Sequence, residues 1–330
     1  MPLPEWARAH GAPLFAARIR QAPADFIVRE HLGFQLSGDG EHDFLYIEKT
    51  GANTEWLARQ LARFADVPAR DVGYSGLKDR HAITLQWFSV PRWNSPDWEQ
   101  LTVEGVRLVD RQRHNKKLRR GAHSANQFRI VLRGEVAGHG ELGRRLELIK
   151  AAGVPNYFGE QRFGRGGANI QLADAWAAGK RLPRHKRSIA ISTARSSLFN
   201  DFLDTRVRAG TWNRMCPGDR ANLDGSGSVF DVDEIDHELE QRCLDMDIHP
   251  AGWLPGVGAP SFETPAGREP WLAALARDRV KAANRSLRLK IMDFSWAAEP
   301  DALVLEFSLG RGAFATSVIR EIAATREREL

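Results

Sequence analysis

The sequence holds only two cysteines, Cys216 and Cys243, among its 330 residues. Neither has a neighbouring Cys or His at zinc-site spacing, which argues against a disulfide framework and against a structural zinc. No apolar run approaches the roughly 18–20 residues that a membrane helix needs. The N-terminal residues also lack the basic-then-apolar order of a signal peptide. We therefore expect a cytoplasmic protein that has no membrane segment.

Several common catalytic motifs are also missing from the sequence. It contains no phosphate loop of the Gly-x-x-x-x-Gly-Lys-Ser/Thr type and no dinucleotide fingerprint after a strand. It also has no Gly-x-Ser-x-Gly elbow and no His-Glu-x-x-His helix. The ten histidines are scattered along the chain. These absences disfavour a metal or dinucleotide enzyme, so an enzyme of this sequence is expected to work with side chains alone, without cofactor or metal.

The composition is that of a globular protein, with 42% hydrophobic and 27% charged residues. The net charge of +5 is modest, but the basic residues are clustered. Residues 111–120 hold six Lys or Arg and no acid, and residues 181–187 are equally free of acids. Such clusters suit the neutralisation of RNA phosphates. They are equally typical of solvated surface loops, and composition alone does not separate the two.

Hydrophobic periodicity predicts an α+β chain without a regular βαβ rhythm. Short strands are expected at 44–48 and 87–90, and alternation predicts another at 128–132. Apolar spacing after the capping residues Asn53 and Thr54 predicts an amphipathic helix through Phe64. A second helix is expected to end at Gly153.

The middle of the chain has a different texture from the first half. Residues 156–170 are expected to form an ordered loop, 235–246 a helix, and 247–270 an irregular Pro- and Gly-rich segment. Alternation then predicts a strand at 303–307, followed by a helix through Ile322. Because this late strand resembles the first half, we expect it to complete the first half's sheet. The middle third would then be an insertion.

Four polar segments are candidates for chemistry. In the first, residues 73–84, the carboxylate of Asp79 lies between Lys78 and Arg80. Nearby cations keep a carboxylate ionised, as a nucleophile requires. A turn with a surface ion pair is the alternative reading.

The other three segments are 126–128, 156–165 and 310–316. Each combines an aromatic residue with amides or arginines, as expected for stacking on an unpaired base. Phe128 could instead be an ordinary core residue of its strand. The 156–165 loop could contact RNA or organise a site, and the last segment could be a simple helix entry.

Taken together, these segments resemble the TruD family of tRNA pseudouridine synthases. The resemblance rests on short motifs that occur in order over most of the chain. They are Asp25–Glu30, Glu48–Thr54, Gly76–Arg80, Gly121–Phe128, Asn156–Gly164, Gly218–Asp219, Leu223–Gly225, His249–Gly252 and Phe314–Glu321. Gly310 and Ala313 depart from the family, whose members usually have Pro and Ser in that loop.

The resemblance implies that Asp79 is the catalytic aspartate. It also implies that Asn126 and Phe128 support it and that Phe314 stacks on the target base. Lys49 and Lys78 are expected beside the substrate. Phosphate contacts are expected from the basic residues of two segments: Lys116, Lys117, Arg119, Arg120, Arg162 and Arg165.

The implied activity is the isomerisation of uridine to pseudouridine at position 13 of tRNA, without cofactor. The implied fold is a V-shaped molecule with two parts. One is a catalytic domain with a mixed, largely antiparallel sheet, expected at 1–153 plus 291–330. The other is an α/β domain inserted into it, at 154–290. We expect a monomer with tRNA as its partner.

Three mechanisms remain open at this point. Asp79 could attack the sugar C1′, attack the base C6, or take a proton from C2′. Two rival functions also remain: a non-catalytic tRNA-binding protein, and a metal-free RNA-cleaving enzyme with His81 or His114 as general base. Cleavage changes the length of the RNA, whereas isomerisation leaves its length and mass unchanged.

Overall fold

The computed structural model describes residues 4–136, 140–260 and 265–327. Contacts within the chain divide it into two compact units. The first comprises residues 1–13, 142–290 and 314–322, and the second comprises 14–141, 291–313 and 323–330. The predicted domain limits of 154–290 and its flanks stay a prediction. No helix among the described residues is long and apolar enough to cross a membrane.

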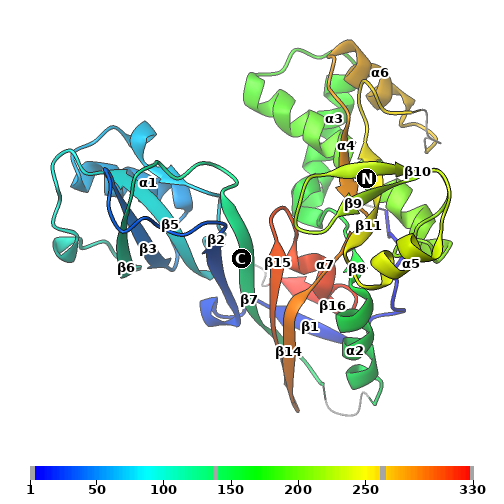
Figure 1. Cartoon of the computed structure of the whole chain (residues 1–330), viewed down its shortest axis with the longest axis horizontal. Coiled ribbons are helices and arrows are strands. Elements are labelled where there is room, and N and C mark those ends of the chain that lie inside the picture. The colour runs from blue at the N-terminus through cyan, green and yellow to red at the C-terminus, as the bar shows by residue number, and fades with distance from the viewer. Residues whose placement is uncertain (1–3, 137–139, 261–264, 328–330) are drawn as a thin grey trace. The chain divides into compact units, whose positions relative to one another are not determined.

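The second unit, which we call the sheet unit, is built on a sheet with the core order β14-β15-β7-β2-β5-β3-β6 (Figure 1). Strand β1 pairs with β16 and β7, and β4 pairs with β5. Only the β2–β5 and β1–β16 pairings are parallel among those described, so the sheet is mixed and largely antiparallel, as predicted. Its strands are β1 (Phe15–Ile19), β2 (Phe26–Leu32), β3 (His42–Lys49), β4 (Gly73–Tyr74), β5 (Ile83–Pro91), β6 (Val106–His114), β7 (His123–Arg133), β14 (Met292–Glu299), β15 (Ala302–Gly310) and β16 (Ala323–Glu327).

The late strand completes the sheet of the first half, which confirms that prediction. Strand β15 pairs with β7 so that Phe307 lies opposite Phe128 and Leu305 opposite Ile130. All four side chains are buried. Alternate residues of a strand point to one face. The apolar positions of both strands therefore meet on the same side of the sheet.

Helix α1 (Thr54–Phe64) covers one face of the sheet unit. Its Asn53 side chain accepts a hydrogen bond from the Trp56 backbone N–H, which caps the helix as predicted. Leu57 and Leu61 are fully buried in a cluster with side chains of β3 and β5, including Phe88. The helix thereby fixes the ends of the strands beside the candidate site.

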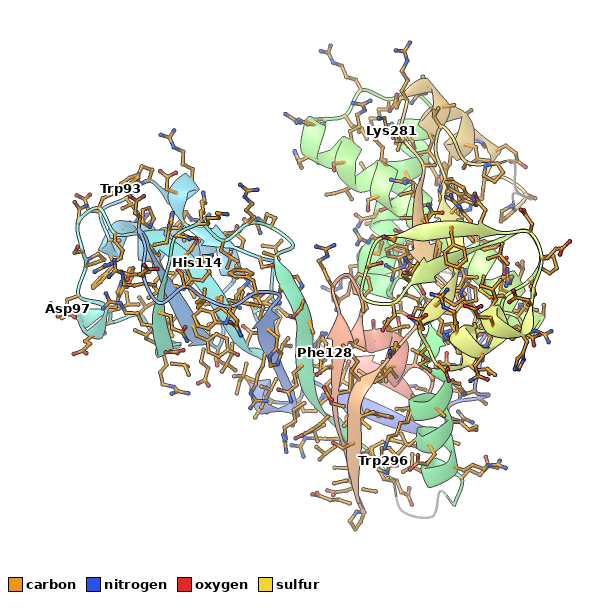
Figure 2. The ribbon with its side chains drawn as sticks, in the orientation of Figure 1. Trp93, Asp97, His114, Phe128, Lys281 and Trp296 are labelled. Atoms are coloured by element: carbon orange, nitrogen blue, oxygen red, sulfur yellow. The ribbon has the colours of Figure 1, made fainter. Side chains whose placement is uncertain are left out.

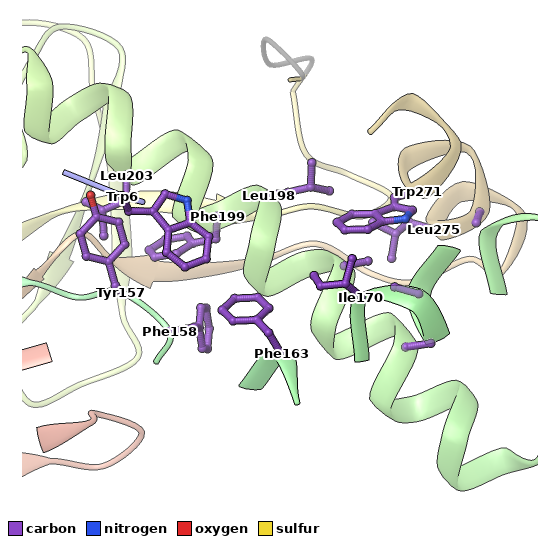
Figure 3. Close-up of a cluster of buried hydrophobic side chains, with 14 of the residues drawn as sticks. Trp6, Tyr157, Phe158, Phe163, Ile170, Leu198, Phe199, Leu203, Trp271 and Leu275 are labelled. Atoms are coloured by element: carbon purple, nitrogen blue, oxygen red, sulfur yellow. The ribbon is translucent and has the colours of Figure 1, made fainter. Parts of the chain in front are cut away.

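The first unit, which we call the helical unit, combines helices with a small sheet of order β10-β9-β11-β12. Its helices are α2 (Leu142–Ala152), α3 (Ala168–Ala177), α4 (Arg184–Arg208), α5 (His237–Leu244), α6 (Glu269–Arg277) and α7 (Ala315–Ile319). Its strands are β8 (Val154–Pro155), β9 (Asp219–Leu223), β10 (Val229–Val232), β11 (Ile248–Leu254), β12 (Ala283–Ser286) and β13 (Arg288–Leu289). Its main core gathers buried aromatic side chains beside α4, among them Tyr157, Phe158, Phe163, Phe199 and Trp271 (Figure 3).

Three predictions for the middle and end of the chain need correction. The expected helix over 235–246 is shorter, since Asp236 caps α5 and Met246 has a left-handed backbone with φ of 57°. The Pro- and Gly-rich segment contains strand β11, whose Pro250 lies opposite Ala221 of β9. The last helix ends at Ile319, before Ile322. Strand β11 was not predicted because prolines usually occur at strand edges or in turns.

Candidate active site

The loop between β4 and β5 carries Asp79. Buried polar side chains fix this loop through hydrogen bonds. Thr54 Oγ1 accepts a hydrogen bond from the Lys78 backbone N–H at 3.0 Å and donates one to Gln86 Oε1 at 3.0 Å. Gln86 Nε2 in turn donates to the Gly76 carbonyl at 2.5 Å. Thr54 and Gln86 are buried, so these bonds are shielded from water. The loop is thereby fixed to α1 and to β5.

Among the described residues, the carboxylate of Asp79 has one ion-pair partner and one backbone hydrogen-bond donor. Arg20 Nη2 lies 3.3 Å from its Oδ2, and the His81 backbone N–H donates to its Oδ1 at 3.0 Å. The Asp79 side chain is 31% exposed, whereas that of Arg20 is 11% exposed. The acid is therefore oriented from one side and remains accessible from the other.

Arg20 is itself held in an uncommon conformation. Its φ is 55°, in the left-handed region, and its guanidinium lies 4.5 Å from the centroid of the Phe26 ring. A non-glycine residue with positive φ costs energy that the surrounding contacts must offset. The stacked ring and the ion pair with Asp79 provide such contacts.

Lys78 does not pair with the neighbouring carboxylate, which corrects the expectation from the sequence. Its ammonium lies 2.9 Å from Glu30 Oε2 and donates to Asn126 Oδ1 at 2.5 Å. Arg80 donates through Nε to the His81 ring at 2.9 Å. Adjacent residues of an extended loop point in different directions, so the cation on Asp79 comes from a distant part of the sequence.

Lys49 lies beneath the same loop and is almost completely buried, at 1% exposure. Its ammonium donates to the backbone carbonyls of Ala52 at 2.8 Å and Asp79 at 3.4 Å. Burial lowers the pKa of Lys49 to about 8, with the charge of Asp79 acting in the opposite direction. The structure thus places Lys49 against the backbone of the loop.

Asn126 and Phe128 project from the same face of β7, which crosses beside this loop. Asn126 lies opposite Glu30 of β2, and within the described chain no group accepts a hydrogen bond from its amide nitrogen. Phe128, labelled in Figure 2, is 8% exposed. Its ring centroid lies 6.2 Å from that of Phe26 and 5.4 Å from that of Phe307. Asn126 therefore has a free donor beside the site, whereas Phe128 is chiefly a packing residue.

His123 is a neighbour of this site that was not selected from the sequence, although it lies within the motif Gly121–Phe128. Its Nδ1 lies 2.6 Å from Ser75 Oγ, whose oxygen also accepts from the His123 backbone N–H at 2.8 Å. Burial lowers the pKa of His123 to about 4, and the positive charges of Lys78 and Arg311 add to this effect. Arg20 and Glu30 were also missed, because their roles depend on pairings across the fold.

The basic residues after β6 lie on an exposed connection anchored by one apolar side chain. Leu118 is buried and its backbone N–H donates to Ser89 Oγ at 2.8 Å. The exposed residues Lys116, Lys117, Arg119 and Arg120 surround it. Lys117 donates to the Arg70 carbonyl at 2.5 Å, and the Arg120 guanidinium lies 3.6 Å from the Tyr74 ring centroid. Their charges remain at the surface.

The remaining predicted site residues belong to the helical unit. Phe314 precedes α7, with its ring 6.1 Å from that of Phe158 between centroids, and Arg162 lies 6.0 Å from the Phe314 ring. Arg165 is exposed. Phe314 and Arg162 line a pocket of about 380 Å³. Phe314 belongs to the helical unit, whereas Asp79 belongs to the sheet unit.

Packing accounts for the aromatic residues of the 156–165 loop. Tyr157, Phe158 and Phe163 are all buried in the core of the helical unit (Figure 3). Asn156 is also buried and accepts a hydrogen bond from Arg285 at 2.6 Å. The loop therefore supports the pocket walls, and its Gln161 and Arg162 side chains line the pocket.

The two histidines considered as general bases of an RNA-cleaving enzyme both contact neighbouring side chains. His81 accepts a hydrogen bond from Arg80, as described above. His114 packs against the rings of Phe34 and Phe44, each 5.2 Å away between centroids, and its Nδ1 contacts Ser37 at 3.2 Å. Among the described residues, no group of three or more His, Cys, Asp or Glu side chains could hold a metal ion.

Comparison with known proteins identifies the family of this chain. The family model of tRNA pseudouridine synthase D (TruD) matches residues 9–173 and 168–322. A protein named tRNA pseudouridine synthase D from Methylococcus capsulatus is 45% identical, over 96% of this chain and 93% of its own. One of the same name from Nitrosococcus oceani is 43% identical, over 96% and 92%.

A solved structure gives the same fold. It comes from Methanosarcina mazei and is named as a candidate tRNA pseudouridine synthase D. It superposes with a TM-score of 0.73 at 19% identity and covers 97% of this chain and 98% of its own. At this identity the likeness concerns the fold alone. The sequence matches, which span nearly the whole chain, establish that this protein belongs to the TruD family of tRNA pseudouridine synthases.

Proposed function

We propose that this protein converts uridine to pseudouridine in tRNA, at position 13, and that Asp79 is the catalytic carboxylate. The observation that carries the proposal is the accessible Asp79 side chain, paired with Arg20 on a loop fixed by Thr54 and Gln86. Membership of the family supports the reaction and its substrate. We further propose that the enzyme acts in the cytoplasm as a monomer.

The reaction breaks the bond between uracil N1 and the sugar C1′ and joins C1′ to C5 of the same base. The proton on C5 leaves and N1 gains one, so the overall composition is unchanged. Asp79 acts as an ionised carboxylate, at C1′, at C6 or on the C2′ proton. All three routes need a carboxylate oxygen close to the sugar and base, and the ion pair with Arg20 orients the Asp79 side chain.

The uridine has to leave its stack before Asp79 reaches it. We propose that Phe314 stacks on the extruded base and that the free amide N–H of Asn126 donates to a carbonyl on its edge. Phe128 supports the site through the packed ring of Phe26, on which Arg20 lies. Lys49 and Lys78 stabilise the loop and its surroundings, while the exposed basic residues meet tRNA phosphates.

The experiment incubates unmodified tRNA with the wild type and with Asp79→Ala. Pseudouridine is then mapped by carbodiimide labelling and reverse-transcription stops. A stop at position 13 with the wild type alone, on RNA of unchanged length, supports the proposal. A tRNA that is bound but never modified would indicate the non-catalytic binder, and shortened RNA would indicate the nuclease.

A further inference from the structure

The pocket of about 380 Å³ is built wholly from the helical unit. Its walls come from Gln161 and Arg162, from the start of α3, from the first turns of α4, and from Phe314. Its volume lies within the range of small-molecule sites, roughly 300–1,000 Å³. None of the residues proposed to act on the uridine from the sheet unit lines it. Apart from Phe314, the lining residues are therefore different from those proposed to act on the uridine.

An arginine without an acidic partner lies in the pocket wall. Arg162 Nη1 donates to Ser192 Oγ at 2.9 Å, and among the described residues no carboxylate lies within ion-pair distance of its guanidinium. Burial lowers the pKa of Arg162. Arg285 stands nearby, 4.1 Å from the Phe158 ring, and the charge of Arg162 adds to burial in lowering its pKa to about 9. The Arg162 guanidinium in the pocket wall favours an anionic or carbonyl-rich ligand.

Side-chain amides surround the same opening. Asn169 Nδ2 donates to the Arg162 carbonyl at 3.1 Å, which leaves its Oδ1 as an available acceptor. The exposed Gln161 amide makes no hydrogen bond within the described chain. Amides that offer both a donor and an acceptor suit the edges of nucleobases, and the Phe314 ring offers a face for stacking.

The basic cluster at 181–187 immediately precedes, along the chain, the α4 residues that line this pocket. Arg181, Arg184 and Lys186 are exposed, and α4 begins within the cluster. Ser188 and Ser192 follow on the same helix and line the pocket. A nucleic-acid backbone along the start of α4 would meet phosphate-neutralising charges just before the opening.

We propose that this pocket holds one unpaired nucleotide of the tRNA, other than the uridine that is isomerised. The inference rests on the proposed function. Because Phe314 lines the pocket and is also proposed to stack on the target base, the second nucleotide is a neighbour of the target in the RNA chain. Its capture would fix the register in which the target uridine is presented, so the pocket is a specificity site.

The test uses the full-length protein with two pocket variants and two matched controls. Ser188→Trp covers the opening, and Thr205→Trp places the same side chain at an exposed position of α4 outside the pocket. Gln161→Leu removes an unpartnered amide, and Gln171→Leu makes the same change at an exposed position of α3. The RNA probes are unmodified tRNA transcripts that lack the base at one position at a time around position 13.

For the wild type, loss of one particular neighbouring base should weaken tRNA binding about tenfold, as expected for a stacked base. Ser188→Trp should weaken binding of intact tRNA by a similar factor. In this variant, loss of the same base should cause no further loss of affinity. Gln161→Leu should act in the same direction, and both controls should behave as the wild type. Equal base sensitivity in Ser188→Trp and the wild type would overturn the proposal.

The two proposals fail in different ways. If the wild type forms no pseudouridine on intact tRNA, the proposed function is wrong, whatever the pocket binds. If the wild type forms pseudouridine and no neighbouring base contributes through the pocket, only the pocket proposal is wrong.

Discussion

Three carboxylates of the sheet unit differ in their exposure to solvent. The side chains of Glu30 and Asp43 are fully buried, and each faces a cation, Lys78 for Glu30 and Arg92 for Asp43. Asp79 also has a cation partner but keeps 31% of its side chain exposed. A buried ion pair stabilises the fold only as a complete pair. The accessible acid is the one able to reach a substrate.

At the scale of single residues, Arg20→Gln should lower the turnover number strongly. Loss of its guanidinium frees the Asp79 side chain from one of its two partners, and misplacement of a reacting group costs about a hundredfold in rate. Single-turnover pseudouridine formation at saturating tRNA measures this effect. Arg18→Gln is the control, since Arg18 is exposed on β1 two positions earlier. Equal rates for Arg20→Gln and wild type would contradict the positioning role.

Lys78→Met should destabilise the protein by about 3 kcal/mol, because it leaves the buried carboxylate of Glu30 without its cation. The double variant Lys78→Met with Glu30→Gln should recover part of that loss. Urea denaturation of the two variants and the wild type measures the free energies of unfolding. If the double variant were no more stable than Lys78→Met alone, the coupling would be absent.

For the helices and strands, alternation was enough to predict the strands within β7 and β15 and to place the late strand in the first half's sheet, but it did not identify β7 as the strand with which β15 pairs. Phe128 and Ile130 alternate with polar residues, and Leu305 and Phe307 do the same. This alternation is typical of a strand that buries one face against an apolar core. Strand β11 was missed because Pro250 and its neighbouring glycines have the composition of a loop. The end of α5 was missed because it depends on the left-handed conformation at Met246, which is not a typical helix-ending residue.

The same contrast holds for the candidate site. Asp79 could be selected because its segment matches a family motif. Its partner Arg20 could not, because an ion pair between distant strands and loops depends on the final fold. The direction of Lys78 towards Glu30 was hidden for the same reason.

The basic residues of the exposed connection after β6 are expected to contribute to tRNA binding. Replacing Lys116, Lys117, Arg119 and Arg120 together with Gln should weaken binding and reduce the slope of log K against log salt by about 3. Filter binding between low and physiological salt measures both quantities. Arg107→Gln is the control, since Glu48 already pairs with Arg107 at 2.9 Å. An unchanged slope in the quadruple variant would show that this connection does not meet phosphates.

At the scale of the whole molecule, stability should fall below neutral pH. The folded protein holds the pKa of His123 at about 4, below the value of about 6.5 expected when unfolded. The unfolded chain therefore binds a proton first, and stability is lost as pH falls from about 6.5 towards 4. Burial also lowers the pKa of His249, which lies beside Asp224 and Arg288, so this residue changes stability with pH in the same direction.

Allowing for partial exposure, His123 should account for about 1 kcal/mol of lost stability at pH 5. Urea unfolding at pH 7 and pH 5 measures the difference, and His123→Gln should show a smaller one. An identical pH dependence in that variant would assign the loss to other groups.

The proposed isomerisation at Asp79 removes the proton from C5 of a tRNA uridine. Transcripts labelled with tritium at C5 of uridine report that step directly, because the tritium passes into water. The wild type should release tritium equivalent to one uridine per tRNA. Asp79→Asn, which keeps the shape of the side chain, should bind tRNA with unchanged affinity and release none. Release by Asp79→Asn at the wild-type rate would contradict the account.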